Sequence, residues 1–278
     1  MPDEPGPIAP TKTLTLDGGL YAEAFVPAGT PKGVVAITHG YAEHCGRYRE
    51  VANVIVRAGW AALSYDVRGH GQSPGKRGYI EHFSIYLDDF AAAIAAAKQL
   101  ATGPLVLLGH SHGSLITLRA LADAKPPTCA AAIVASPYLG LKLAVPAYKK
   151  LLARVASKVA PGLAQPNSLR VEDLTHDPAK QAERLADKLC FDIATARWFT
   201  EAAAAQDFTF EHASKIGVPV TWLVGGADPI ADPAQSKRVA DRVRGSDYHE
   251  YAQMRHEVFN EIGRGEVFGE ITKRLASL

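Results

Sequence analysis

The segment Leu105–Gly113, LVLLGHSHG, decides the fold. Its four leading apolar residues are typical of a strand that is buried on both faces, as in a parallel sheet. The strand runs into a G-x-S-x-G pattern at 109–113, and a helical pattern follows over Leu115–Ala124. In a strand–turn–helix of this kind the serine is held exposed above the sheet. The pattern therefore predicts that Ser111 is a nucleophile, and the alternative is a serine that caps the helix.

Short apolar runs and helical patterns alternate along most of the chain, which indicates an α/β protein with a mostly parallel central sheet flanked by helices. Between Tyr138 and Asp207 the pattern is helical throughout and is punctuated by prolines. We expect this insertion to be a helical cap over the C-terminal edge of the sheet. The expected organisation is a disordered N-terminal tail over 1–10, a core in two parts over 11–137 and 213–278, and a cap over 138–212.

The individual elements are expected from their apolar periodicity. The expected strands are Val34–Thr38, Trp60–Tyr65, Ala130–Ala135, Val220–Val224 and Tyr248–Met254. The expected helices are Arg49–Ala58, Glu81–Leu100 and Glu257–Leu275.

Composition narrows the class of protein. The 278 residues include 30 Lys and Arg against 29 Asp and Glu, a formal net charge of +1. Because neutralising phosphates requires a basic excess, this balance argues against nucleic acid as a main partner. The three cysteines are scattered without C-x-x-C spacing, which is typical of reduced thiols in a cytosolic protein. No apolar run approaches the roughly 20 residues that span a bilayer, and no signal-peptide pattern opens the chain, so we expect a soluble cytoplasmic protein.

A second G-x-S-x-G string occurs at 71–75, around Ser73. Pro74 follows this serine and has no backbone N–H, so it cannot donate a hydrogen bond to an oxyanion. No buried strand leads directly into the string either. We therefore interpret Ser73 as a turn residue.

A serine nucleophile needs an adjacent base that is itself oriented by an acid, and in this architecture both follow the serine in the chain. Four histidines lie well after Ser111. His176 falls in the cap, His212 just precedes a strand, and His249 lies within the last strand pattern. His256 follows that strand on a loop that can reach over the sheet edge, so we predict that His256 is the base.

The acid is expected at the end of the strand Val220–Val224, in the sequence GGADP. A carboxylate at the C-terminal end of a strand can reach a histidine on the next loop, which favours Asp228. Asp232 lies four residues further on, where it is expected to begin or cap the next helix. For the oxyanion, the backbone N–H groups of Tyr41, in the loop after an early strand, and of His112 are the predicted donors.

Taken together, five ordered segments resemble the monoacylglycerol lipase and lysophospholipase group of α/β-hydrolases. The resemblance extends from about Gly33 to the end of the chain, and the cap matches more loosely. The segments are HGYAEHCGRY (His39–Tyr48), YDVRGHGQSPGKRG (Tyr65–Gly78), LLGHSHG (Leu107–Gly113), LVGGADPI (Leu223–Ile230) and MRHEVFNE (Met254–Glu261).

The resemblance implies the α/β-hydrolase fold and hydrolysis of acylglycerols or related single-chain lipid esters, without a cofactor. It carries over Ser111, Asp228 and His256 as the catalytic triad, with Tyr41 and His112 at the oxyanion positions. It also implies structural roles for the residues of the second segment around Asp66, Arg68 and His70. A thioesterase or a polyester or xenobiotic-ester hydrolase on the same triad is the alternative within enzymes. From another class, a ligand-binding module on a hydrolase fold is the alternative, although such proteins usually lose a triad member.

Three residues depart from the family pattern. Ala42 and Ser114 stand where the family usually has glycine, and His112 stands where it usually has methionine. We expect the His112 side chain to project towards the pocket or the cap and to hydrogen-bond a cap residue, a water or a polar substrate group, which would shift preference towards shorter or more polar acyl groups. The alternative is a side chain turned away into a structural hydrogen bond.

The cap segment Pro146–Ala160 is amphipathic and basic. One interpretation is transient docking on an anionic lipid surface. The interpretation that we favour is a cap helix that packs its apolar face on the acyl pocket.

A metal site is not expected. His39, His44, Cys45 and His70 come close together in the sequence, but their spacing matches no ligand pattern.

Overall fold

The computed structural model describes residues 4–142, 146–167 and 169–278. Within those residues one eight-stranded sheet has the order β1-β2-β4-β3-β5-β6-β9-β10. The first two strands pair antiparallel with their neighbours, and all other pairs are parallel. The strands are β1 (Lys12–Thr15), β2 (Tyr21–Phe25), β3 (Val34–Thr38), β4 (Ala61–Tyr65), β5 (Leu105–His110), β6 (Ala131–Ala135), β9 (Val220–Gly225) and β10 (Ser246–Tyr251).

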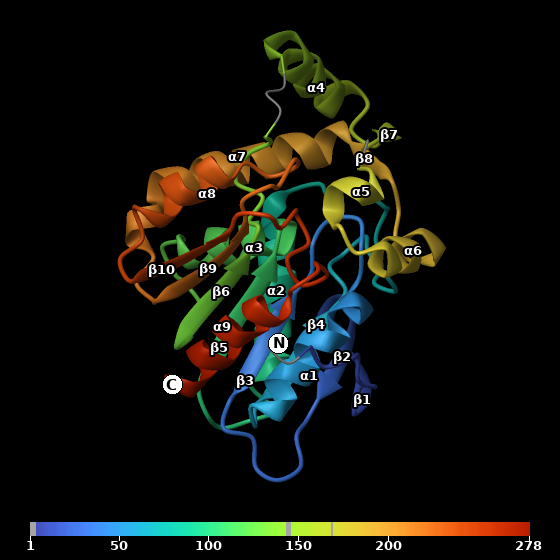
Figure 1. Cartoon of the computed structure of the whole chain (residues 1–278). Coiled ribbons are helices and arrows are strands. Elements are labelled where there is room, and N and C mark those ends of the chain that lie inside the picture. The colour runs from blue at the N-terminus through green and yellow to red at the C-terminus, as the bar shows by residue number, and fades with distance from the viewer. Residues whose placement is uncertain (1–3, 143–145, 168) are drawn as a thin grey trace.

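Helices cover both faces of this sheet (Figure 1). Helices α1 and α9 pack on one face, whereas α2, α3 and α8 pack on the other. Their bounds are α1 (Arg49–Arg57), α2 (Phe83–Ala97), α3 (His112–Leu121), α8 (Pro233–Ala240) and α9 (Gly265–Ala276). The three-layer arrangement and the parallel strands are those of the α/β-hydrolase fold that the sequence predicts.

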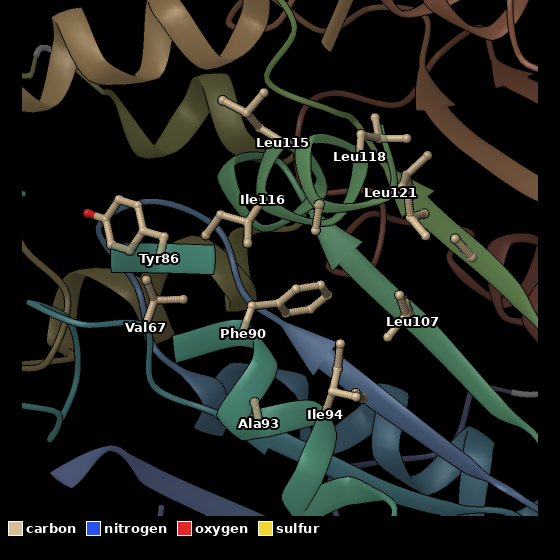
Figure 2. Packing of buried hydrophobic residues seen from close by; sticks show 14 of the residues in the cluster. Val67, Tyr86, Phe90, Ala93, Ile94, Leu107, Leu115, Ile116, Leu118 and Leu121 are labelled. Atoms are coloured by element: carbon tan, nitrogen blue, oxygen red, sulfur yellow. The ribbon is translucent and has the colours of Figure 1, made fainter. Parts of the chain in front are cut away.

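The core between α2, α3 and the sheet fixes the position of the candidate nucleophile. Residues of α2 recur at helical spacing on its buried face, and Figure 2 shows Phe90 and Ile94 of this face beside Leu107 of β5. Leu115 and Ile116 of α3 are fully buried in the same cluster. Burying a side chain of this size contributes about 1.5–3 kcal/mol to folding. Because such side chains lie on both β5 and α3, the two elements that flank the turn are anchored in the core.

The cap is inserted between β6 and β9 and is less uniformly helical than expected. Two short strands pair antiparallel within it, because the chain extends on either side of α5 and α6. Its elements are α4 (Ala147–Val159), β7 (Ala164–Pro166), α5 (Val171–Leu174), α6 (Pro178–Ala186), β8 (Ile193–Thr195) and α7 (Ala196–His212). Figure 1 shows α4 at the top of the molecule, beyond α7. Ser157 of α4 and Thr200 of α7 share a hydrogen bond of 2.9 Å.

Several further features differ from the expectations. The strand β10 spans Ser246–Tyr251 and not Tyr248–Met254, and α3 spans His112–Leu121 and not Leu115–Ala124. The last helix begins at Gly265 and not at Glu257, because residues 257–264 form turns around the buried side chains of Glu257 and Glu261. Residues 4–10, expected to be a disordered tail, lie on the core. Glu4 pairs with Arg264 at 3.4 Å, and Pro5 is buried. Residues 1–3 of that expected tail lie outside the described residues.

No helix in the part of the chain that the structure describes is both long and apolar enough to cross a membrane.

Candidate active site

The turn from β5 to α3 presents Ser111 in a strained backbone conformation, with φ of 50° and ψ of −113°. Two glycines permit this turn. A Cβ on Gly113 would lie 2.1 Å from the carbonyl oxygen of Thr38, and one on Gly109 would lie 2.6 Å from that of Gly113. Strain of this kind persists only where the surrounding packing enforces it, and it lifts the serine Oγ above the sheet edge.

Three side chains from different parts of the chain meet at this turn. The Ser111 Oγ lies 2.8 Å from the Nε2 of His256, and the Nδ1 of His256 lies 2.7 Å from the Oδ2 of Asp228. The other carboxylate oxygen of Asp228 accepts backbone N–H groups of Ile230 and Ala231 at 2.8 and 3.0 Å. These bonds leave the Nδ1–H of His256 to donate to the carboxylate and its Nε2 to accept from the serine hydroxyl. All three side chains are buried.

The rejected candidates lie elsewhere. Asp232 caps α8 by accepting the N–H of Ala234 at 3.1 Å, as expected. His176 contacts Glu261, and His212 stacks on Phe208. His249 lies on β10. The structure therefore brings together the serine, the histidine and the aspartate that the sequence selects.

Electrostatics at His256 favour its protonated form. Burial, the largest single influence, lowers the pKa of this histidine, but the charge and hydrogen bond of Asp228 and the charges of Glu257 and Glu43 outweigh it, so that the pKa is raised above its ordinary value. An imidazole of this kind accepts a proton readily from an attacking hydroxyl.

The two predicted oxyanion donors flank the serine. Tyr41 lines the cavity beside Ser111, and its hydroxyl donates to the carbonyl of Ile193 in the cap at 2.7 Å. His112 is the first residue of α3, where backbone N–H groups have no helical acceptor. Within the described residues, neither backbone N–H donates a hydrogen bond to another protein group. Both are therefore free to bind a negative oxygen.

Within the part of the chain that the structure describes, the His112 side chain does not make the hydrogen bond to a cap residue that was one of its expected partners. The imidazole is fully buried, and both ring nitrogens lack a partner among the described residues. It lies among aromatic rings, with ring centroids 4.9 Å from Tyr86, 5.5 Å from Trp198, 6.1 Å from Tyr41 and 6.4 Å from His70. Burial lowers its pKa to about 3. The side chain is not part of the cavity lining, and rings of Tyr86 on α2 and Trp198 on α7 pack against it.

The serine and histidine open onto a cavity of about 600 Å³, within the range typical of small-molecule sites. The lining that the cap contributes is mostly apolar, with Lys149, Gln165, Asn167, Arg184 and Thr195 as its polar members. The apolar side comprises Leu141, Tyr148, Leu152, Ala153, Ala156, Pro166, Leu169, Leu174, Ala194, Ala196, Trp198, Phe199 and Ile230. Charged side chains on the lining are Glu43, Lys149, Arg184, His256 and Glu257.

A buried ionic network behind the triad was missed by sequence reasoning. Arg47 contacts Glu43 at 2.9 Å and Glu257 at 2.6 Å. His110 faces Glu43 through Nδ1 at 3.3 Å and the carbonyl of His256 through Nε2 at 3.2 Å. Burial raises the pKa of Glu43, but His110 and Arg47 hold it well below its ordinary value. This network fixes the backbone of the loop that carries His256, and its only sequence signal was that Glu43, Arg47, His110 and Glu257 all fall within the motifs.

Ser73 makes two structural hydrogen bonds. Its hydroxyl donates to the carbonyl of Asp66 at 2.6 Å and accepts the N–H of Tyr21 at 3.0 Å. The first bond ties the loop to the end of β4, and the second ties it to β2. No histidine hydrogen-bonds this hydroxyl among the described residues, so it has no base.

The neighbouring histidines also serve loop structure. His39 contacts the carbonyl of Gly40 through Nδ1 at 2.6 Å and accepts the N–H of Val67 through Nε2 at 2.9 Å. His44 turns towards Asp187 of the cap, at 2.6 Å.

An eight-stranded sheet with a Ser–His–Asp arrangement at the end of its central strand defines a serine hydrolase of the α/β-hydrolase fold. The sequence model of the family described as "Serine aminopeptidase, S33" matches residues 29–263, and the chain belongs to this family.

Relatives of this chain include lipolytic enzymes. The chain is 31% identical over 259 residues to monoacylglycerol lipase of Mycolicibacterium smegmatis, covering 92% of each. It is 27% identical over 244 residues to phospholipase YtpA of Bacillus subtilis, covering 87% of this chain and 94% of that relative. The crystal structure of Paleococcus ferrophilus monoacylglycerol lipase superposes with a TM-score of 0.84 at 29% identity, covering 93% of this chain and 98% of that one. The chain is therefore a serine hydrolase of carboxylic esters.

Proposed function

We propose that this enzyme hydrolyses monoacylglycerols or similar neutral esters with one acyl chain, through an acyl-enzyme on Ser111. The observation that carries the proposal is the pair of contacts of 2.8 and 2.7 Å that joins Ser111, His256 and Asp228, with Ser111 and His256 on the lining of a cavity whose cap side is mostly apolar.

The chemistry follows from these contacts. The Ser111 Oγ attacks the ester carbonyl as the Nε2 of His256 takes its proton, and the Asp228 carboxylate stabilises the imidazolium that forms. The oxyanion of the tetrahedral intermediate accepts hydrogen bonds from the backbone N–H groups of Tyr41 and His112. His256 then protonates the leaving alcohol oxygen, and the carbon–oxygen bond breaks. Water, deprotonated by His256, attacks the acyl-enzyme, and His256 returns that proton to the Ser111 Oγ as the acid leaves.

The two sides of the cavity support the choice of substrate. The apolar side along the cap suits an acyl chain. Near the catalytic serine, Arg184 lies 3.7 Å from Glu257 and donates to the carbonyl of Ala42 at 3.3 Å, so these two charges compensate one another, whereas Lys149 belongs to the cap side of the lining. A hydroxylated neutral head group can hydrogen-bond such a wall, whereas a phosphate would face the carboxylates of Glu43 and Glu257. This favours a glycerol head group over that of a lysophospholipid.

A matched set of substrates tests the proposal. Hydrolysis of a monoacylglycerol, a lysophosphatidylcholine, an acyl thioester and an aryl ester of one acyl length is compared by kcat/KM. We expect the monoacylglycerol to be preferred by about tenfold or more, since one lost polar pairing costs about 1–3 kcal/mol. Preference for the lysophospholipid or the thioester would contradict the assignment of the head group and leave the triad chemistry intact.

We also propose that α4 docks transiently on an anionic lipid surface. Leu151, Val155 and Val159 are 61%, 51% and 77% exposed. Tyr148 and Leu152 of α4 line the cavity, as the favoured interpretation of this helix expects, but these three side chains lie open to solvent. Arg154 and Lys158 are also exposed on the helix. Exposed apolar side chains beside basic ones match the surface of a membrane that carries acidic lipids.

Vesicle sedimentation tests this docking. We expect binding to vesicles with 30% phosphatidylglycerol, weaker binding to pure phosphatidylcholine, and loss of binding in the double variant Leu151→Asp, Val155→Asp. Leu185→Asp is the matched control, because Leu185 is 73% exposed but lies on α6. Equal loss in the control variant, or no binding by the parent enzyme, would refute docking through α4.

A cytoplasmic location completes the proposal. It is supported by Cys45, Cys129 and Cys190, all of which are free thiols.

A further inference from the structure

A histidine and two carboxylates converge where the edge strand β10 meets the last helix. Asp247 and His249 are two residues apart, so their side chains lie on the same face of β10. Glu270 of α9 packs over that face. The Nε2 of His249 lies 3.0 Å from the Oδ1 of Asp247 and 3.5 Å from the Oε2 of Glu270. None of the three lines the catalytic cavity.

The His249 nitrogen is buried between these oxygens without a hydrogen bond to either of them. Because 3.0 Å is within hydrogen-bond range, this contact fails on its angle, so the ring nitrogen is not aligned with the Asp247 oxygen. Zinc binds imidazole nitrogen and carboxylate oxygen at about 2.0–2.2 Å with tetrahedral angles, which places neighbouring ligand atoms roughly 3.3–3.5 Å apart. The separations of 3.0 and 3.5 Å therefore need only small side-chain shifts to become two edges of such a tetrahedron.

We propose that Asp247, His249 and Glu270 form a zinc site, with water as the fourth ligand. Imidazole with two carboxylates is a ligand set that suits Zn²⁺. The ion would join β10 to α9, and an ion that binds only the folded state stabilises that state. The bound zinc would therefore stabilise the contact between the last helix, α9, and the edge strand β10. It would take no part in ester hydrolysis.

Two positively charged side chains lie close to the carboxylates of the proposed site and lower its affinity for zinc. Arg274 lies 3.5 Å from Asp247, and Lys273 lies 3.2 Å from Glu270. Zinc competes with both for the carboxylates. Lys273 is 69% exposed and can turn into solvent when the ion binds.

A second group with ligand-type atoms, His44, Asp187 and Cys190, is less suited to zinc. The Nδ1 of His44 accepts the N–H of Gly46 at 3.2 Å, so the neutral ring carries its proton on Nε2, where a metal would bind. Burial raises the pKa of the Cys190 thiol to about 11, so the sulfur is protonated at neutral pH. These contacts instead join the cap to the core.

Zinc titration of the chelator-treated enzyme tests the proposal, with binding measured by competition against a fluorescent zinc indicator. We expect one saturable site and a zinc-dependent rise in Tm. His249→Ala and Glu270→Gln should each weaken binding by about tenfold or more, since each removes one of three protein ligands. His44→Ala is the matched control and should bind zinc as the parent does.

Three results would overturn the site: no saturable binding by the parent, undiminished binding by both His249→Ala and Glu270→Gln, or loss of binding in His44→Ala alone. Ester hydrolysis by each variant at 25 °C checks that it is folded.

Discussion

Replacement of His112 by methionine should stabilise the enzyme. The imidazole is fully buried, with no partner for either nitrogen among the described residues. Each buried polar group without a hydrogen bond costs about 1–3 kcal/mol. Methionine removes both groups and contributes sulfur–aromatic contacts of about 0.3–1.5 kcal/mol with rings such as Tyr86 and Trp198. Part of this gain is offset, because ordering the flexible methionine costs up to about 2 kcal/mol.

The net gain is expected to be about 2 kcal/mol at pH 8. For a chain of this size, each kcal/mol raises Tm by about 2 °C, so Tm should rise by about 4 °C. The gain should grow as the pH falls. In the folded enzyme burial lowers the pKa of His112 to about 3, whereas an unfolded histidine has a pKa of about 6.5. Below pH 6.5 the parent therefore loses stability that the variant keeps, about 1.4 kcal/mol more at pH 5.5 than at pH 8.

Thermal and urea unfolding of parent and variant at pH 8 and 5.5 provide the assay. His39→Met is the matched control, because His39 is equally buried but uses both ring nitrogens. The control should be destabilised, since it leaves the N–H of Val67 unpaired. If His112→Met is destabilised to the same degree, His112 has a partner in solution and the reasoning is refuted.

Four further predictions concern catalysis. Since only neutral His256 accepts the serine proton, kcat/KM should fall as the pH drops through an apparent pKa above 6.5, and Asp228→Asn should lower kcat by about 10⁴; a pH profile without this acid limb would contradict the role of His256. Across acyl lengths kcat/KM should rise about fourfold per methylene until the apolar wall is filled, and a flat profile would mean that the chain is not enclosed. His112→Met should leave that length profile unchanged, because the side chain lies outside the cavity; a shifted optimum would revive a direct contact with substrate. EDTA should not change the rate at 25 °C, and a loss that zinc restores would bring metal into the reaction.

Much of the architecture could be predicted because buried parallel strands are short, continuous apolar runs. The strand Val34–Thr38 was predicted with its observed ends. The strands β1 and β2 were missed, since β1 is largely exposed and neither stands out as an apolar run. The start of α9 was misplaced because the apolar residues Val258 and Phe259 continue its periodicity while folding as turns.

The three triad positions followed from chain order and from the ends of strands, both of which sequence displays. The supporting network could not be predicted, because Arg47 and Glu257 are 210 residues apart and meet only in the folded chain. The orientation of His112 was also beyond the sequence. It depends on which rings of α2 and α7 close over the start of α3.

Mass mapping after reaction with a fluorophosphonate tests the central claim most directly. The probe phosphonylates a serine that has both a base and an oxyanion site, and in this structure Ser111 contacts His256 at 2.8 Å. The account predicts a single adduct on the peptide that contains Ser111, loss of hydrolysis in proportion to labelling, and neither labelling nor appreciable hydrolysis in Ser111→Ala, whose kcat should fall by about 10⁶. An adduct on Ser73, or full hydrolytic activity in Ser111→Ala, would contradict it.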